Sequence, residues 1–363
     1  MDGIASGSAT AFYLYDVGEG IDLSGVRALV DATVRAPLTP KVTTPPYIQY
    51  QQPPVTIEGR ALGIADVDGF RVRFKVFDYG VISVALTRDL PGTWDALLQQ
   101  GLQLHDNSGL SAAAERLCRV LIDRLMPAIA RPRQELLSED YLVFSVLPVA
   151  GAQAAETLLA ARGTDIAQLL RGEREALSAQ ERDEVLRHRI SYFTSDLVVP
   201  TWNAAFICDS EAGVQGALEL LEFANSQLLE FRYYDRLLDA ELARIYAQLH
   251  GGGWGRTWFA RRYARAARNV HALFIDVNEL TDKTENALKI VGDVYAARVF
   301  ALAAARLGLD QWKENVHEKL QTLDDIYRFA VEQTGMVRGQ VLELTIVLIL
   351  LFELALFFMG IMN

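Results

Sequence analysis

The sequence predicts an α+β fold, in which an N-terminal mixed α/β domain precedes a long antiparallel, coiled-coil-like helical stalk and one C-terminal transmembrane helix. Three observations predict it. All 11 prolines fall at or before Pro200, strand-like segments occur only before about residue 210, and an apolar run closes the chain. Because proline interrupts helix interiors, the proline-free remainder is expected to form long helices. The expected domains are residues 1–210, 211–340 and 341–363.

Short apolar segments in the first domain carry the pattern of strands. Residues 70–77 (FRVRFKVF) alternate apolar and basic side chains, as a half-buried strand does, and Asp68-Gly69 before them is a hairpin signal. The other expected strands are residues 11–17, 79–86, 141–147, 190–199 and 204–208, the last two forming a hairpin.

Helices and loops separate these strands. A helix is expected from Ser24 to about Val34, a proline-rich loop at 37–54, and a helix opened by the capping box Ser178-Ala-Gln-Glu181. Strands and helices mixed in this order predict an open sheet with helices on one face.

Beyond residue 210 the apolar period becomes helical. Apolar residues recur every three or four positions from Leu221 to Leu249, as in a coiled-coil seam. The glycines at 251–253 end that helix, a second is expected at about 258–306, and a third begins at Asp310. Asp235 lies on the first seam, where an unpaired charge is costly. We expect Arg298 of the second helix to pair with it.

Residues Leu344 to Met362 form an apolar run of 19 residues interrupted by Glu353. At about 1.5 Å per residue this run covers roughly 28 Å, close to the hydrocarbon thickness of a bilayer. It predicts a single-pass C-terminal anchor, with the bulk of the chain on the cytoplasmic or organelle matrix side, because the N-terminus lacks a secretory signal. Since an isolated carboxylate is costly inside a membrane, Glu353 predicts contact between helices of a homo-oligomer.

Composition and motifs favour no chemistry. Two cysteines and five scattered histidines support neither a disulfide framework nor a metal site, and the chain lacks a phosphate loop, a nucleophile elbow and HExxH. Asp66-x-Asp68 is interpreted as a turn rather than a metal site. We predict no catalytic residues, cofactor or metal.

Several short motifs resemble the "required for meiotic nuclear division" family. They are Phe77-Asp78-Tyr79-Gly80-Val81, Ser191-Tyr192 with Asp196-Leu197-Val198-Val199, Arg232-Tyr233-Tyr234-Asp235, and Leu342-Glu343 followed by Glu353. The chain departs from the family pattern at Leu344, where a tryptophan is expected. The resemblance implies a membrane-tethered α+β domain of unknown function with a helical stalk, and a link to organellar translation in mitochondrial members.

One segment is strongly basic although the chain carries a net charge of −11. Residues 254–268 interleave aromatic and basic side chains and contain no acidic residue. The contact residues proposed there are Trp254, Arg256, Trp258, Arg261, Arg262, Arg265 and Arg268. Such a segment is typical of contact with anionic lipid, and RNA is the alternative ligand.

The sequence therefore predicts a membrane-tethered scaffold that oligomerises through its stalk and anchor and presents the α+β domain to a protein partner. A membrane tether for RNA or ribosomes is the first alternative, and an enzyme of unknown chemistry is the second.

Overall fold

The computed structural model describes residues 6–33, 53–90, 92–105, 107–148, 155–250, 275, 277 and 294–358. Two compact units divide the chain. Unit 1 comprises Met1–Tyr233 and Leu280–Lys313, and unit 2 comprises Tyr234–Glu279 and Glu314–Asn363. Each unit is described by itself.

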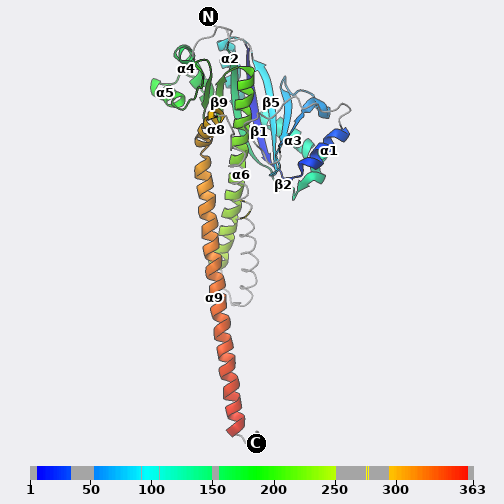
Figure 1. Ribbon diagram of the computed structural model, residues 1–363, viewed down its shortest axis with the longest axis vertical. Coiled ribbons are helices and arrows are strands. Elements are labelled where there is room, and N and C mark those ends of the chain that lie inside the picture. Colours follow the sequence, from blue (N-terminus) through cyan, green and yellow to red (C-terminus); the bar gives the residue numbers. More distant parts are fainter. Residues whose placement is uncertain are drawn as a thin grey trace. The chain divides into compact units, whose positions relative to one another are not determined.

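A mixed sheet of seven strands forms the centre of unit 1, in the order β3-β4-β5-β1-β7-β9-β8 (Figure 1). Neighbours are antiparallel except β7 and β9, which are parallel. The strands are β1 (Ser6–Asp16), β3 (Val55–Glu58), β4 (Arg71–Val76), β5 (Val81–Leu90), β7 (Leu137–Leu147), β8 (Leu197–Pro200) and β9 (Ala204–Cys208). A second sheet pairs β2 (Gly20–Ile21) with β6 (Ile129–Ala130).

The described helices fall into two sets, one before and one after the last strand of the sheet. The short helices are α1 (Leu23–Thr33), α2 (Trp94–His105), α3 (Ser108–Leu125), α4 (Ala155–Arg171) and α5 (Ala179–Arg187). The helices after the last strand are α6 (Glu211–His250), α8 (Val294–Leu307) and α9 (Leu309–Phe358), of which α6 and α9 are long. The α+β class predicted from the sequence is therefore confirmed. The long helices α6 and α9 lie in the proline-free part of the chain after Pro200.

One face of the sheet, called the apolar face below, packs against the short helices. Alternate residues of each strand point to this face, and they form one hydrophobic core with side chains of α1 to α4. Phe74, Phe144 and Phe206 are completely buried in it. The burial of these strands follows from the hydrophobic effect, which favours removing apolar surface from water.

The opposite face, called the charged face below, lies under the first half of α6. Lys75 of β4 points to this face, one residue after the apolar Phe74, and makes ion pairs with Glu219 and Glu222 of α6. Helices therefore cover both faces of the sheet. The expectation of helices on one face was wrong. The helical period of α6 predicts a stalk, but residues 216–231 are all buried and the helix covers the sheet.

Local signals are seen as the sequence indicates. Asp68 and Gly69 both have positive φ between Val67 and Phe70, which bridge each other in the hairpin. The Ser178 hydroxyl accepts a hydrogen bond from the Glu181 amide at 3.2 Å and opens α5. Gly80 has φ +97°, and a Cβ there would lie 2.0 Å from the Gly18 carbonyl oxygen, so this turn requires glycine.

The structure corrects the C-terminal anchor, and with it the predicted location. Over the described residues, which end at Phe358, no helix combines the length and the apolar character needed to cross a membrane. Glu353 also interrupts the apolar character of this helix, and a carboxylate near the middle of a membrane span is costly.

The long antiparallel stalk is not shown either. The helix expected at 258–306 is described only at residues 275 and 277 and from Val294 onward, so its pairing with a neighbour lies outside the described residues. The proline-rich loop at 37–54 also lies outside them, apart from its last two residues.

Candidate functional site

The loop before edge strand β8, residues 190–196, exposes two neighbouring aromatic side chains. Tyr192 is 60% exposed and Phe193 is 67% exposed, and their rings meet edge to face with centroids 4.8 Å apart. We call residues 190–196 the aromatic loop. Large apolar side chains exposed side by side are uncommon on a protein surface unless they contact another molecule.

Asp196 holds the aromatic loop in one conformation. Its two carboxylate oxygens accept hydrogen bonds from the amides of Tyr192 and Phe193, each at 2.7 Å. Asp196 itself is buried, and charge-assisted bonds of this kind are short and strong. The backbone that carries both aromatic rings is therefore fixed before any partner binds.

Tyr295 of α8 contacts the aromatic loop at Tyr192 and Asp196. Its ring lies 5.5 Å from that of Tyr192 between centroids, and its hydroxyl lies 3.5 Å from Asp196 Oδ1. Burial, followed by the negative charge of Asp196, raises the pKa of Tyr295 well above its usual range. The phenol thus stays protonated and can donate to Asp196 at physiological pH. A third exposed aromatic residue, Trp202, lies in the turn between β8 and β9.

A second group of functional side chains is buried between the charged face and α6. Lys75 Nζ lies 2.5 Å from carboxylate oxygens of both Glu219 and Glu222, and Arg73 lies 3.7 Å from Glu222. Burial opposes ionisation of Glu222, but Lys75 and Arg73 outweigh it and lower the pKa of this carboxyl. The four side chains balance to zero charge, and Lys75 is held by both glutamates. We interpret this arrangement as one that stabilises the contact between helix and sheet.

The charged face continues to the end of β1. The Arg133 guanidinium donates to Asp16 at 3.2 Å and stacks over the Tyr233 ring, 4.0 Å from its centroid. Glu230 of α6 is buried beside them, and its Oε1 has no hydrogen-bond partner in the part of the chain that the structure describes. Burial, followed by the charge of Asp16, raises the pKa of Glu230 well above its usual range.

The residues singled out from the sequence lie apart from both groups. In unit 2, Asp235 of α6 makes its ion pair with Lys319 of α9 at 2.6 Å, and Lys319 also contacts Asp239. Arg298, the partner expected for Asp235, is exposed on α8. Lys319 takes this place because α9 brings its ammonium group within reach of both Asp235 and Asp239, one turn apart on α6.

Glu353 is exposed on α9, within the segment whose membrane assignment is corrected above. The basic and aromatic residues from Trp254 to Arg268 lie outside the described residues, so contact with lipid or RNA stays a prediction.

Sequence reasoning missed the aromatic loop. Residues 190–199 were assigned to one strand, whereas the strand begins at Leu197 and only Ile190 makes an isolated bridge with Val198. The available signal was Asp196, since an aspartate near the end of a polar stretch often accepts hydrogen bonds from nearby backbone amides in a turn. That signal places a turn, but exposure of the aromatic rings depends on the fold around it.

These features define a class of α+β proteins in which a seven-stranded mixed sheet is covered by short apolar helices on one face and by a polar long helix on the other. Residues 6–215 match the family described as "Uncharacterized protein MJ0711, N-terminal domain", and the chain belongs to that family. The matched residues include the whole sheet and the beginning of α6.

The "Uncharacterized protein MJ0711" of Methanocaldococcus jannaschii is 25% identical to the chain over 191 residues, or 53% of the chain. The chain spans 58% of the length of this relative. No solved structure gives a significant match.

The family match corrects the resemblance to the "required for meiotic nuclear division" family, to which nothing in the comparisons points. The physical reason is that the quoted motifs serve local structure. Phe77 to Val81 contains the Gly80 turn that a tight hairpin requires, and Asp196 serves the backbone of its own loop. Short motifs of this kind recur wherever the same turn is needed.

Proposed function

We propose that the chain is an interaction protein, a scaffold whose α+β unit binds a protein partner through Tyr192 and Phe193. The observation that carries the proposal is the exposure of both rings on a loop that Asp196 holds fixed. Aromatic residues are enriched among the side chains that dominate binding energy. A fixed loop also lowers the entropy lost on binding, because its side chains are already oriented.

Self-association is the second part of the proposal, and α9 supports it. The six consecutive apolar residues 346–351 are each 47–59% exposed. A contiguous exposed apolar surface of this kind indicates contact with another molecule. We propose that copies of the chain associate through this part of α9, with Glu353 at the contact between helices.

The binding of a partner is tested by photo-crosslinking in the cells that make the protein. A photoreactive phenylalanine analogue replaces Phe193, and in the matched control it replaces Val120, which is exposed on α3. We expect one protein to be captured at position 193 and not at position 120. Its affinity for the purified chain should fall at least tenfold in Tyr192→Ser and Phe193→Ser variants. An unchanged affinity in both variants would contradict the proposal.

Self-association has its own test. Cross-linking of the full chain in buffer without detergent should give a ladder of species, and Glu353→Leu should change it. A ladder that is identical in the variant removes Glu353 from the contact, and the absence of any ladder refutes self-association.

The RNA alternative predicts a different outcome of the capture experiment. Recovery of RNA that dissociates at high salt, and that is lost when the five arginines from Arg256 to Arg268 become glutamines, would favour a nucleic-acid tether.

A further inference from the structure

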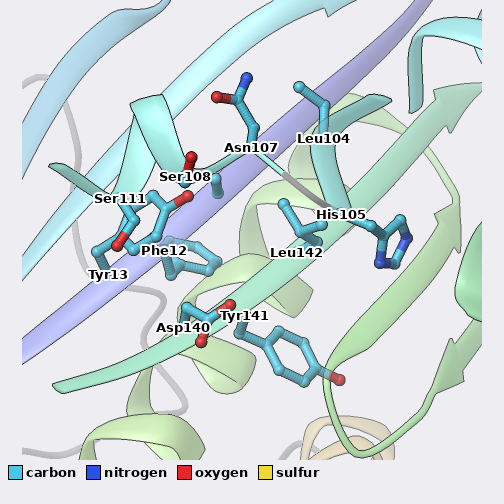
Figure 2. A pocket seen from close by; sticks show the side chains of 11 residues that line it. Phe12, Tyr13, Leu104, His105, Asn107, Ser108, Ser111, Asp140, Tyr141 and Leu142 are labelled. Carbon is cyan, nitrogen blue, oxygen red and sulfur yellow. The ribbon is translucent and has the colours of Figure 1, made fainter. Parts of the chain in front are cut away.

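A pocket of about 330 Å³ opens over β1 and β7 where α2 ends and α3 begins (Figure 2). Its volume lies at the small end of the range for ligand pockets, about 300–1,000 Å³. Figure 2 shows Tyr13, Ser108 and Ser111 on one side of the pocket and His105 on the other. The pocket is separate from the aromatic loop and from the charged face.

The pairing of β1 with β7 builds the floor of this pocket. Tyr13 is the cross-strand partner of Asp140, and Ala11 is the partner of Leu142. Directly paired residues point to the same face of the sheet with Cβ atoms about 4.5–5.5 Å apart. The floor therefore has a polar pair beside an apolar pair. Tyr141, between them, points to the opposite face, where its hydroxyl donates to the Thr201 and Ala204 carbonyls.

Two polar groups of the wall are already used by the protein. His105 Nε2 donates to the Leu169 carbonyl oxygen at 2.7 Å. The Asn107 side chain accepts a hydrogen bond from the Leu110 amide at 3.1 Å and caps α3. These contacts fix the wall of the pocket in place.

Tyr13 is the opposite case. It is 8% exposed, yet its hydroxyl has no hydrogen-bond partner among the residues that the structure describes. Burial, followed by the charge of Asp140, raises the pKa of Tyr13 to about 12, so the phenol carries its proton at neutral pH. The hydroxyl itself is accessible, because it is not one of the buried polar atoms without a partner. It lines the pocket and can bond to a molecule that enters it.

The charge of the pocket indicates what it accepts. Among the described residues that line the pocket, Asp140 is the formally charged side chain and it is exposed, and neither lysine nor arginine is present. A carboxylate on the floor attracts an ammonium group and repels an anion. On the side of the pocket formed by α3, Ser108 and Ser111 lie in the first turn of the helix, where the helix dipole favours an electron-rich oxygen.

We propose that this pocket binds a small amino alcohol. The ammonium group pairs with Asp140, the alcohol oxygen accepts a hydrogen bond from the Tyr13 hydroxyl and lies toward Ser108 and Ser111, and the carbon chain contacts Ala11 and Leu142. The ligand supplies a hydrogen-bond partner for the accessible Tyr13 hydroxyl. This site is independent of the protein contact proposed above, because none of its residues belongs to the aromatic loop.

The test titrates the full chain with ethanolamine and 4-amino-1-butanol by calorimetry, with amide NMR spectra to locate the site. The uncharged 1,4-butanediol and the anionic 4-hydroxybutyrate are the comparison compounds. We expect saturable binding of the amines alone, with shifts of the Ser108 to Ser111 amides. Asp140→Asn should weaken amine binding at least tenfold, and Tyr13→Phe about threefold.

The matched control is Asp123→Asn, which removes an exposed carboxylate from α3 outside the pocket and should leave binding unchanged. Thermal unfolding without ligand shows whether each variant is folded. The proposal is overturned if neither amine saturates the chain, if 1,4-butanediol binds as tightly, or if folded Asp140→Asn binds the amines with wild-type affinity.

Discussion

The two faces of the central sheet are stabilised by different interactions, although consecutive residues of the same strands contribute to both faces. On the apolar face Phe74 packs into a hydrocarbon core with α1 to α4. On the charged face its neighbour Lys75 is equally buried but is held by two glutamates of α6. Hydrophobic burial tolerates many partners, whereas a buried charge is stable only with its own counter-charge. The apolar face therefore gives stability, and we interpret the charged face as the part that fixes where α6 lies.

Removing one member of the buried cluster gives the largest expected effect. Lys75→Met leaves Glu219 and Glu222 buried without their main counter-charge, and should reduce the free energy of unfolding by about 3–5 kcal/mol. The loss should shrink as the pH falls toward 4, where the carboxylates become protonated. Urea unfolding at several pH values measures both effects.

A compensating variant tests whether unpaired charge causes the loss of stability in Lys75→Met. Replacing Lys75 by methionine together with Glu219 by leucine removes one charge of each sign and leaves Arg73 paired with Glu222, and should restore most of the lost stability. A double variant as unstable as Lys75→Met would mean that packing, rather than unpaired charge, explains the loss.

A substitution on the apolar face should reduce the free energy of unfolding by a similar amount, but without the dependence on pH. Phe74→Ala removes a completely buried ring and should cost about 3–5 kcal/mol through lost burial and the cavity that remains. Because no ionisable group is involved, this cost should be the same at pH 5 and pH 8. Urea unfolding of the variant beside Lys75→Met makes the comparison, and a strong pH dependence for Phe74→Ala would contradict it.

Glu230 should act in the opposite direction. Its folded-state pKa is raised by burial and by Asp16, so the unfolded chain releases its proton more readily and stability falls as pH rises through and above the usual glutamate pKa of about 4.3. Glu230→Gln should therefore stabilise the chain at pH 7 and leave it unchanged near pH 4. Equal stability of variant and wild type at pH 7 would show that Glu230 is ionised without cost.

The smallest effect is expected in unit 2. Lys319 is partly exposed in its ion pairs with Asp235 and Asp239, and solvent weakens such pairs. Lys319→Met should change the free energy of unfolding by about 0.2–1 kcal/mol, and the difference should diminish in high salt. A loss as large as that of Lys75→Met would place this pair with the buried cluster.

The sequence by itself determined the elements whose cause is local. Alternation in residues 70–77, the Asp68-Gly69 turn and the Ser178 cap of α5 all depend on neighbours a few positions away, and the structure has each of them. The Glu181 carboxylate of the expected capping box pairs with Arg171 instead. The loss of proline after Pro200 likewise determined that α6 and α9 would be long.

Only the tertiary structure decided which side chains share a site. Lys75 and Glu222 are 147 positions apart, and Tyr13 meets Asp140 only through the register of β1 with β7. An apolar period in α6 is the same for a stalk helix and for a helix laid on a sheet, because periodicity records which residues are buried and not what buries them. The covering of both faces, the partner of Asp235 and the exposure of Tyr192 and Phe193 follow from packing between distant segments.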